Sequence, residues 1–211
     1  MIAVADADAA LLARCRSNDA QAFDEIVARY KDRIYNYIGR MVGPGPDAED
    51  LAQETFVRAY VSLRTFQSRA SLNTWLYRIA TNLCIDHARR GRGRATLPLM
   101  PDRDADRDEG ACREVRDDRY GPEALALNAE LGAEIDAALA SLPRKLRSVV
   151  VLFDVEGLTY EEIARVTACP MGTVKSRLFN ARQALRARLA PYLDGVLTPA
   201  ADAHRRHGGS P

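Results

Sequence analysis

The chain has 211 residues, of which 47% are hydrophobic, 28% charged and 7% aromatic, and its formal net charge is +1. This composition is ordinary for a soluble globular protein with room for one large or two small domains, and the net charge alone indicates no particular partner. No apolar run approaches the ~20 residues that cross a bilayer, and the N-terminus has acids where a signal peptide has cations; we therefore expect a cytoplasmic protein.

The first half of the chain has the apolar period of helices. Between residues 19 and 41 large apolar side chains recur at three- and four-residue steps, which predicts an amphipathic helix with Asp19 as its N-cap and the GPGP sequence as its end. A second helix is expected after Asp47 as its N-cap, and a third from about Ser71 to the glycines of HARRGRGR. No alternating strand pattern interrupts these helices.

Residues 91–121 differ from both flanks, because they are dense in Asp and Arg and poor in large apolar side chains. Such a segment buries too little apolar area to offset its loss of chain entropy, so we expect a flexible linker, either a solvated spacer or a segment threaded through a partner's channel. Helices resume at Pro122 and Pro143, the second ending at Gly157, and the tail after Gly195 is predicted to be disordered. The predicted fold class is all-α, with two small helical domains joined by this linker.

The segment after Gly157 has the pattern of a helix-turn-helix. Thr159 followed by Glu162 is a capping box, which predicts a helix from Tyr160. The ACPMG sequence then forms the turn, and Thr173 is the expected N-cap of the next helix.

The second helix of this motif carries charge of one sign. No carboxylate occurs between Thr173 and Leu193, whereas a solvated helix usually mixes signs for pairing along its surface. The side chains predicted to point outward are Lys175, Ser176, Arg177, Asn180 and Arg182. In such motifs the first residues of this helix enter the major groove and later cations contact phosphate. An ordinary exposed basic helix is the alternative, but the turn, the caps and the charge together favour DNA binding.

The four cysteines, Cys15, Cys84, Cys112 and Cys169, are far apart and form no CxxC pair. Cys84 and His87 lie three residues apart, yet no second Cys/His pair completes a metal site. We expect reduced thiols that pack as small apolar groups, and neither a metal nor another cofactor.

Three stretches, in this order, carry a resemblance to a known family. They are DAEDLAQETFVRAY (47–60), F…S…WLYRIATNLCIDHARR (66–90) and LP…VVVLFDVEGLTYEEIARVTACPMGTVKSRLFNARQALR (142–186). Together they resemble bacterial RNA polymerase sigma factors of the extracytoplasmic function (ECF) group, in the sigma-70 family. The resemblance implies a transcription initiation factor, not an enzyme, that binds core RNA polymerase, directs it to promoters and assists promoter opening. It also implies the division into 1–92 (region 2), 93–121 (linker), 122–194 (region 4) and 195–211 (disordered tail).

The resemblance further implies a role for each group of residues. The β′ clamp helices of the polymerase are expected to contact Glu49, Asp50, Gln53, Glu54 and Arg58. The −10 promoter element and the melting of DNA involve Tyr77, Arg78, Thr81, Asn82, Asp86, Arg89 and Arg90. The −35 element involves Thr173, Lys175, Ser176, Arg177, Asn180 and Arg182. Residues 66–72 are expected to hold a flipped base, and extra phosphate contacts are expected from Arg144, Lys145 and Arg147. The polymerase β subunit and an anti-sigma factor complete the expected partners.

One departure from the family pattern concerns the turn, which commonly carries a glycine followed by a branched apolar residue. Here Ala168 and Cys169 stand at these positions. If Ala168 adopts a positive φ, the cost is on the order of 1 kcal/mol. Because neither residue faces DNA, this departure bears on stability more than on specificity.

Two other classes of protein compete with this interpretation. A stand-alone helix-turn-helix activator of the response-regulator type has a similar EIA…TVK sequence, but its receiver would be α/β with an aspartate after a strand, and no such pattern occurs. A DNA-processing enzyme would need a carboxylate cluster or a metal-type spacing, and the sequence has neither.

Overall fold

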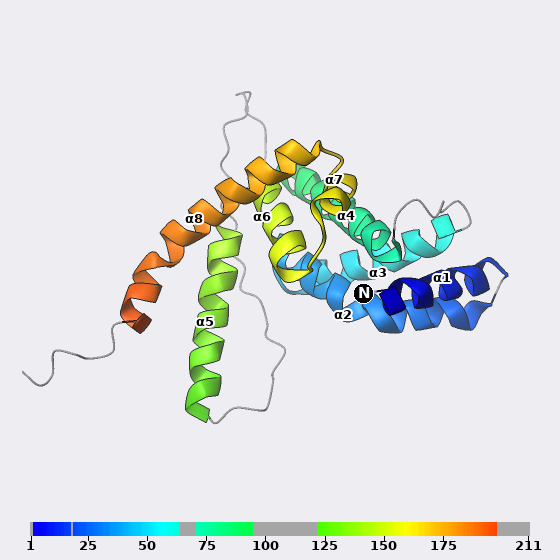
Figure 1. Cartoon of the computed structure of the whole chain (residues 1–211), viewed down its shortest axis with the longest axis horizontal. Helices are drawn as coiled ribbons and strands as arrows, with labels where there is room; N and C mark the ends of the chain where they lie inside the picture. Colours follow the sequence, from blue (N-terminus) through cyan, green and yellow to red (C-terminus); the bar gives the residue numbers. More distant parts are fainter. Residues whose placement is uncertain (1, 18, 64–70, 95–121, 198–211) are drawn as a thin grey trace, which may run out of the picture.

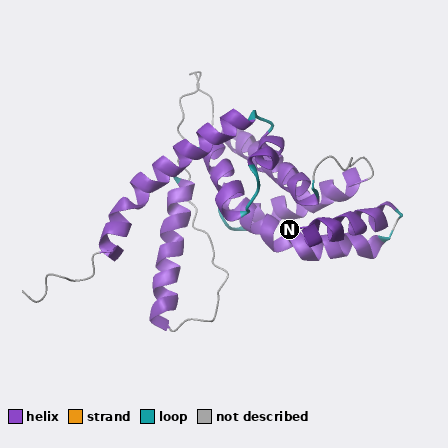
Figure 2. Cartoon of the chain, in the orientation of Figure 1, coloured by secondary structure: helices purple, strands orange, loops and turns teal. Residues whose placement is uncertain are grey.

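The structure is a computed structural model that describes residues 2–17, 19–63, 71–94 and 122–197 (Figure 1). Within these ranges the chain is built from helices and short turns, and no β-strand occurs there (Figure 2). The elements are α1 (Ile2–Arg16), α2 (Ala20–Val42), α3 (Pro46–Ser62), α4 (Leu72–Arg94), α5 (Pro122–Ala140), α6 (Arg144–Val150), η2 (Val151–Val155), α7 (Tyr160–Thr167) and α8 (Met171–Leu197). The predicted all-α class is confirmed. Most of the predicted linker, the end of the predicted tail and the base-capturing loop as far as residue 70 lie outside the described residues.

Helix α2 begins and ends where the sequence predicts. The Asp19 carboxylate accepts hydrogen bonds from the backbone N–H groups of Gln21 (3.0 Å) and Ala22 (3.3 Å), which satisfies two of the N–H groups left free at a helix start. At the other end Gly43 adopts φ 93°, a conformation that glycine takes without a steric cost. Local side-chain chemistry thus sets both ends of this helix.

The predicted bounds of the neighbouring helices need three corrections. Helix α3 begins at Pro46 after Gly45, so Asp47 lies in its first turn and is not the N-cap; proline is well suited to the first helical position. Helix α4 continues through the HARRGRGR sequence to Arg94, since a glycine disfavours a helix by only about 1 kcal/mol and does not have to end it. Helix α1 was not expected at all, and it packs on α2 through the buried Leu11 and Leu12.

The predicted helix from Pro143 to Val155 is divided in the structure. Helix α6 ends at Val150 and is followed by the π-helical turn η2, after which Gly157 takes φ 71°. Helix α8 begins at Met171 and not after Thr173, because the N–H groups of Thr173 (2.9 Å) and Val174 (3.1 Å) both donate to the Pro170 carbonyl. The helix-turn-helix is therefore as predicted in type, and its second helix begins three residues earlier than predicted.

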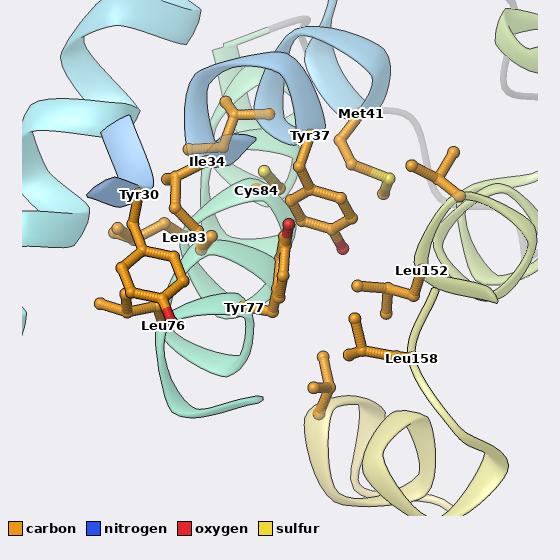
Figure 3. Close-up of a cluster of buried hydrophobic side chains, with 14 of the residues drawn as sticks. Tyr30, Ile34, Tyr37, Met41, Leu76, Tyr77, Leu83, Cys84, Leu152 and Leu158 are labelled. Carbon is orange, nitrogen blue, oxygen red and sulfur yellow. The ribbon is translucent and has the colours of Figure 1, made fainter. Parts of the chain in front are cut away.

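The two helical halves, α1–α4 and α5–α8, lie against one another and share one apolar core. In Figure 3, Tyr37 and Met41 of α2 and Tyr77 of α4 face Leu152 of η2 and Leu158 of the following turn. All five side chains are buried. Helix α7 contacts α4, and the two lie side by side in Figure 1. The domains named in the prediction are thus in direct contact in this structure.

Candidate nucleic-acid interface

The helix-turn-helix is held together by a capping box and a small apolar core. Glu162 accepts a hydrogen bond from the Thr159 N–H (3.0 Å) and donates its own N–H to the Thr159 hydroxyl (3.3 Å), so the predicted capping box is confirmed. The buried side chains between the two helices are Ile163, Val166, Val174, Leu178 and Ala181. In the turn, Ala168 adopts φ 50° and ψ 42°, as expected for the position usually held by glycine.

The outward side of α8 is open. Lys175, Ser176, Asn180 and Arg182 are exposed, while Thr173 and Arg177 are half-buried. Arg177 approaches the Cys169 sulfur at 3.6 Å, so the guanidinium stands at the start of the helix beside the turn. None of the six side chains predicted to meet the −35 element is buried.

An aromatic pair beside α8 was not expected from the sequence. Phe153 and Tyr160 stack with ring centroids 4.9 Å apart. The Lys175 ammonium lies 5.6 Å from the Tyr160 centroid and the Arg182 guanidinium 5.2 Å from that of Phe153, both within cation–π range. Arg182 also donates from Nε to the Asp154 carboxylate at 3.1 Å, and this hydrogen bonding raises the arginine's pKa. The pair therefore holds two of the predicted DNA-binding cations at fixed places.

Phe179 is a further residue absent from the predicted set. It is 64% exposed, one turn after Lys175 on the open side of α8. If α8 enters the major groove as predicted, an exposed Phe at this place suits contact with a thymine methyl group. Its position in the helical period, outward and next to Asn180, was the available signal.

Helix α4 presents only part of its predicted set. Arg78, Asn82, Asp86, Arg89 and Arg90 are exposed, and Asn82 and Asp86 share a face because they are one turn apart. Asp86 lies 3.9 Å from Arg89, and its backbone carbonyl accepts a hydrogen bond from Arg90 at 3.4 Å. This exposed row is continuous along the middle of the helix.

Tyr77 and Thr81, which were expected to meet the −10 element, are buried at 0% and 2% exposure. The Thr81 hydroxyl donates to the Tyr77 carbonyl (2.7 Å) and hydrogen-bonds the Tyr37 hydroxyl (2.8 Å). Tyr77 itself packs edge-on against Tyr37, with centroids 5.2 Å apart, and donates to Glu156 of the other half. Helix α4 is covered by α2 and also by the C-terminal half, so these two side chains are not available at the surface as expected.

Helix α3 presents a polar face opposite its buried side. Glu49, Asp50, Gln53 and Arg58 are exposed and Glu54 is half-buried. Glu54 and Arg58, four residues apart on the helix, form an ion pair with Nε 2.7 Å from Oε1. Beside this face lie three exposed apolar side chains that were not predicted, namely Val57, Tyr60 and Val61, at 57%, 60% and 75% exposure. Burial of such an exposed apolar patch against another protein removes it from water, which favours a protein contact here.

The phosphate role expected for Arg147 is not supported by its position. Its side chain is 7% exposed and donates to the carbonyl oxygens of Met41 (3.0 Å), Leu142 (3.1 Å) and Ala140. The neighbouring Lys145 is exposed. The sequence pattern could not distinguish these two cations, because the carbonyl of Met41 comes from the other half of the chain.

The described cysteines, Cys15, Cys84 and Cys169, are free thiols. Burial raises the pKa of Cys84 to about 12, so this thiol stays protonated at neutral pH and is a poor nucleophile. Across the described ranges, no three His, Cys, Asp or Glu side chains gather as they would around a metal ion. Of the helices that the structure describes, none combines the length and the apolar character needed to cross a membrane.

Comparison with protein families gives two matches. The family model for sigma-70 region 2 matches residues 26–94, and the model for sigma-70 region 4 matches residues 132–185. The first match contains α3 and α4, and the second contains the helix-turn-helix.

Individual relatives agree with these matches. The chain is 38% identical over 190 residues to the RNA polymerase sigma-H factor of Pseudomonas aeruginosa, covering 88% of this chain and 95% of the relative. It is 37% identical over 192 residues to the ECF RNA polymerase sigma-E factor of Escherichia coli, covering 88% and 96%. With the ECF RNA polymerase sigma factor SigE of Mycolicibacterium smegmatis the identity is 42% over 171 residues, covering 81% of this chain and 63% of that relative's length.

Solved structures give the same fold. The structure of CnrH in complex with the cytosolic domain of CnrY matches with a TM-score of 0.62 and 25% identity, covering 88% of this chain and 98% of that one. The sigma factor RpoE of Bartonella quintana matches with a TM-score of 0.63 and 23% identity, covering 81% and 98%.

Proposed function

The chain belongs to the ECF group of the sigma-70 family, and from this premise we propose how its surfaces share the work of transcription initiation. Members of this group are promoter-directing initiation factors, and this chain is one of them. In the proposal it contributes binding and DNA opening in the cytoplasm, without a cofactor, while all phosphoryl transfer takes place in the polymerase.

The observation that carries the proposal is the open, one-signed face of α8. Its first turns expose Lys175 and Ser176 beside the half-buried Arg177, in the place from which a recognition helix contacts base edges. An arginine there suits bidentate hydrogen bonds to guanine. Asn180 and Phe179 extend the same face, and the later cations suit phosphate contacts. We assign this face to the −35 element.

Helix α4 is assigned to the −10 element. Asn82 and Asp86 are exposed and one turn apart, and their amide and carboxylate groups suit adenine and cytosine edges respectively. Arg89 and Arg90 follow on the exposed side and suit the phosphate backbone. Holding an extruded base costs a few kcal/mol and needs stacking surfaces, and the segment expected to supply them, residues 66–72, lies mostly outside the described residues.

Helix α3 is assigned to the β′ clamp helices of core polymerase. Glu49, Asp50 and Gln53 are exposed and stand away from the buried side of the helix. The exposed Val57 and Tyr60 add an apolar patch next to this polar face, as in the centre of protein interfaces. Contact of the region 4 half with the β subunit completes the proposed docking.

The division into residues 1–92, 93–121, 122–194 and 195–211 is retained as part of the proposal, with the second segment as a linker and the last as a tail. An anti-sigma factor is proposed as a further partner. The related fold in RpoE of Bartonella quintana was solved in complex with the anti-sigma factor NepR, and CnrH was solved with the cytosolic domain of CnrY.

The alternative of a stand-alone activator of the response-regulator type is not favoured. Its receiver would be α/β, whereas the N-terminal half is helical throughout its described residues and contains the sigma-70 region 2 match. The two functions differ in one requirement: a sigma factor lets core polymerase initiate on its own, whereas an activator acts only on a polymerase that already carries a sigma subunit.

The test is reconstituted transcription with purified chain, core RNA polymerase that lacks any sigma subunit, and a library of promoter fragments. Specific initiation from a subset of the fragments is expected. If transcripts form only after another sigma factor is added, the proposal is wrong. A variant with Asp50 and Gln53 changed to alanine should lose core binding, whereas the change of the exposed Glu161 to alanine should not.

A further inference from the structure

The turn of the helix-turn-helix contains a thiol that contacts the side chain of a residue on α8. Cys169 is half-buried, and its backbone N–H donates to the Ala164 carbonyl at 3.2 Å, which fixes the residue at the end of α7. Its sulfur accepts a hydrogen bond from a guanidinium nitrogen of Arg177, 3.6 Å away in the second turn of α8. Cys169 therefore connects the turn to a residue that is assigned to the −35 element.

A threonine at the end of α7 sets the direction of the hydrogen bonds around this sulfur. The Thr167 hydroxyl donates to the Ile163 carbonyl at 2.7 Å, and its oxygen lies 3.1 Å from the Cys169 sulfur. A hydroxyl has only one proton to donate, and here the Ile163 carbonyl receives it. The thiol S–H is therefore the donor to Thr167. The sulfur lone pairs are left to accept from Arg177, whose guanidinium has donors only.

These contacts form one chain of hydrogen bonds, from the guanidinium through the sulfur and the hydroxyl to the backbone of α7. Arg177 is half-buried beside the turn, whereas its neighbours Lys175 and Ser176 are exposed. Immobilising a rotamer-rich side chain on binding costs conformational entropy. A guanidinium that is already held loses less of this entropy and meets its partner from one direction. A branched apolar residue at position 169, as is common in the family, has no acceptor with which to hold it.

We propose that Cys169 is a positioning residue for promoter recognition: it does not touch DNA, and it sets the direction from which Arg177 meets a base edge of the −35 element. The promoter part of this inference rests on the proposed function of α8, whereas the contact between sulfur and guanidinium does not. From the sequence, the departure from the family pattern at Cys169 is expected to matter for stability. In this proposal it acts on specificity.

The effect of Cys169 is expected to be smaller than that of Arg177 itself. Sulfur is a weak hydrogen-bond acceptor, and without it the guanidinium still reaches a base from other rotamers. The loss should therefore appear as a broader base preference at one position of the −35 element, with unchanged affinity for DNA of unrelated sequence. We expect discrimination there to fall about three- to tenfold, which is less than the loss of a whole bidentate contact.

The first measurement uses the free full chain under reducing conditions. Nuclear magnetic resonance gives the order parameter of the Arg177 Nε–H bond, which should be high in wild type and in Cys169→Ser, where an acceptor remains. It should be lower in Cys169→Val, which removes the acceptor and introduces a residue of the kind that the family carries in this turn. Cys15→Val, at a half-buried thiol on α1, is the matched control and should leave the Arg177 signal unchanged. Equal order parameters in wild type and Cys169→Val overturn the proposal.

The second measurement selects −35 sequences from a randomised promoter library with the polymerase–sigma complex. Wild type and Cys169→Ser should prefer the same base at the position that Arg177 reads, and Cys169→Val should discriminate less at that position alone. In an Arg177→Ala background, Cys169→Val should have no further effect. A loss by the same factor in that background, or one spread over all positions, overturns the positioning role.

The two measurements separate this inference from the proposed function. The order parameter is obtained without polymerase or DNA, so it decides the contact between Cys169 and Arg177 whatever the result of the transcription test. If the wild-type complex selects no sequence, the proposed function fails and the promoter part of this inference fails with it. If wild type selects a sequence and Cys169→Val selects the same one with equal discrimination, only the positioning role is overturned.

Discussion

The two helices assigned to DNA, α4 and α8, differ in how they are presented. Helix α8 buries a narrow stripe, Val174, Leu178 and Ala181, and leaves its outward side to solvent. Helix α4 is covered along one side by α2 and at its N-terminal end by α7 and the turn around Glu156. The face of α8 proposed for the −35 element is thus open to solvent, whereas part of the α4 face predicted to meet the −10 element is covered.

This difference shows that a helix can be fully formed while some of its side chains are buried and cannot contact DNA. The exposed cations and amides of α8 need no rearrangement before they meet a duplex. On α4, Asn82 and Asp86 are equally accessible, but Tyr77 is covered by Tyr37 of α2 and by the turn around Glu156. Order of contact with DNA would then follow from packing and not from charge.

The largest effect is expected where the two halves meet, because a substitution there tests whether their contact stabilises the chain. Arg147→Met leaves the Met41, Ala140 and Leu142 carbonyls without the guanidinium that they bind. Since an unpaired buried polar group costs about 1–3 kcal/mol, we expect a loss of roughly 2–4 kcal/mol in the free energy of unfolding, measured by urea denaturation. Lys145→Met, at an exposed neighbour, should change it by less than about 0.5 kcal/mol. Equal losses would show that Arg147 is not an interior anchor.

The next prediction tests whether α8 is the open reader. Arg177→Ala should weaken binding of the polymerase–sigma complex to its promoter by ten- to a hundredfold, because one bidentate base contact contributes about 1–3 kcal/mol of discrimination. Fluorescence anisotropy with labelled promoter DNA at fixed salt measures the change. Affinity for core polymerase should stay at the wild-type level. Arg188→Ala, at an exposed cation farther along the helix, should weaken binding to all DNA sequences alike. A loss of affinity for the promoter sequence alone would show that the base-contacting residues include Arg188.

The turn before α8 offers a smaller and opposite effect. Ala168 has φ 50°, a region in which L-residues are strained, so Ala168→Gly should stabilise the chain by about 0.5–1 kcal/mol. In thermal denaturation this corresponds to a rise of roughly 1–4 °C for a chain of this size. At the exposed Ala187, inside α8, the same substitution should destabilise by about 1 kcal/mol. A decrease at both sites would mean that the strain at Ala168 is negligible.

The smallest effect is expected on promoter affinity when the acid that pairs with Arg182 is removed. Arg182 donates to Asp154 and would have to leave it to bind phosphate. An exposed ion pair contributes about 0.2–1 kcal/mol, so Asp154→Asn should strengthen promoter binding up to about fivefold in low salt. Glu161→Gln removes a negative charge from the same half without touching Arg182 and should give a smaller gain. Equal gains would point to net charge alone.

Features that depend on near neighbours were predictable from the sequence. The cap at Asp19, the capping box of Thr159 and Glu162, the Glu54–Arg58 pair and the positive φ of Ala168 each involve residues within four positions. Helix starts were less certain where two adjacent residues compete, as at Pro46 and Asp47. In that case the fixed φ of proline decided the outcome.

Features that depend on distant parts of the chain were missed. The residue that covers Tyr77 is 79 positions away, and the carbonyl that holds Arg147 is 106 positions away. No helical period contains that information, because it describes one face of one helix. The stacked Phe153 and Tyr160 were missed for a related reason: they lie on either side of a turn, and their alignment depends on the π-helical turn η2.

The apolar core that crosses both halves also has a consequence for cooperativity. Leu152 and Leu158 lose their burial against Tyr37 and Tyr77 when the halves separate, so each half is less stable alone than in the free chain. In isolation the chain should therefore melt as a single cooperative unit. If an initiation complex separates the halves, the polymerase surface has to replace the apolar contacts that each half supplies to the other.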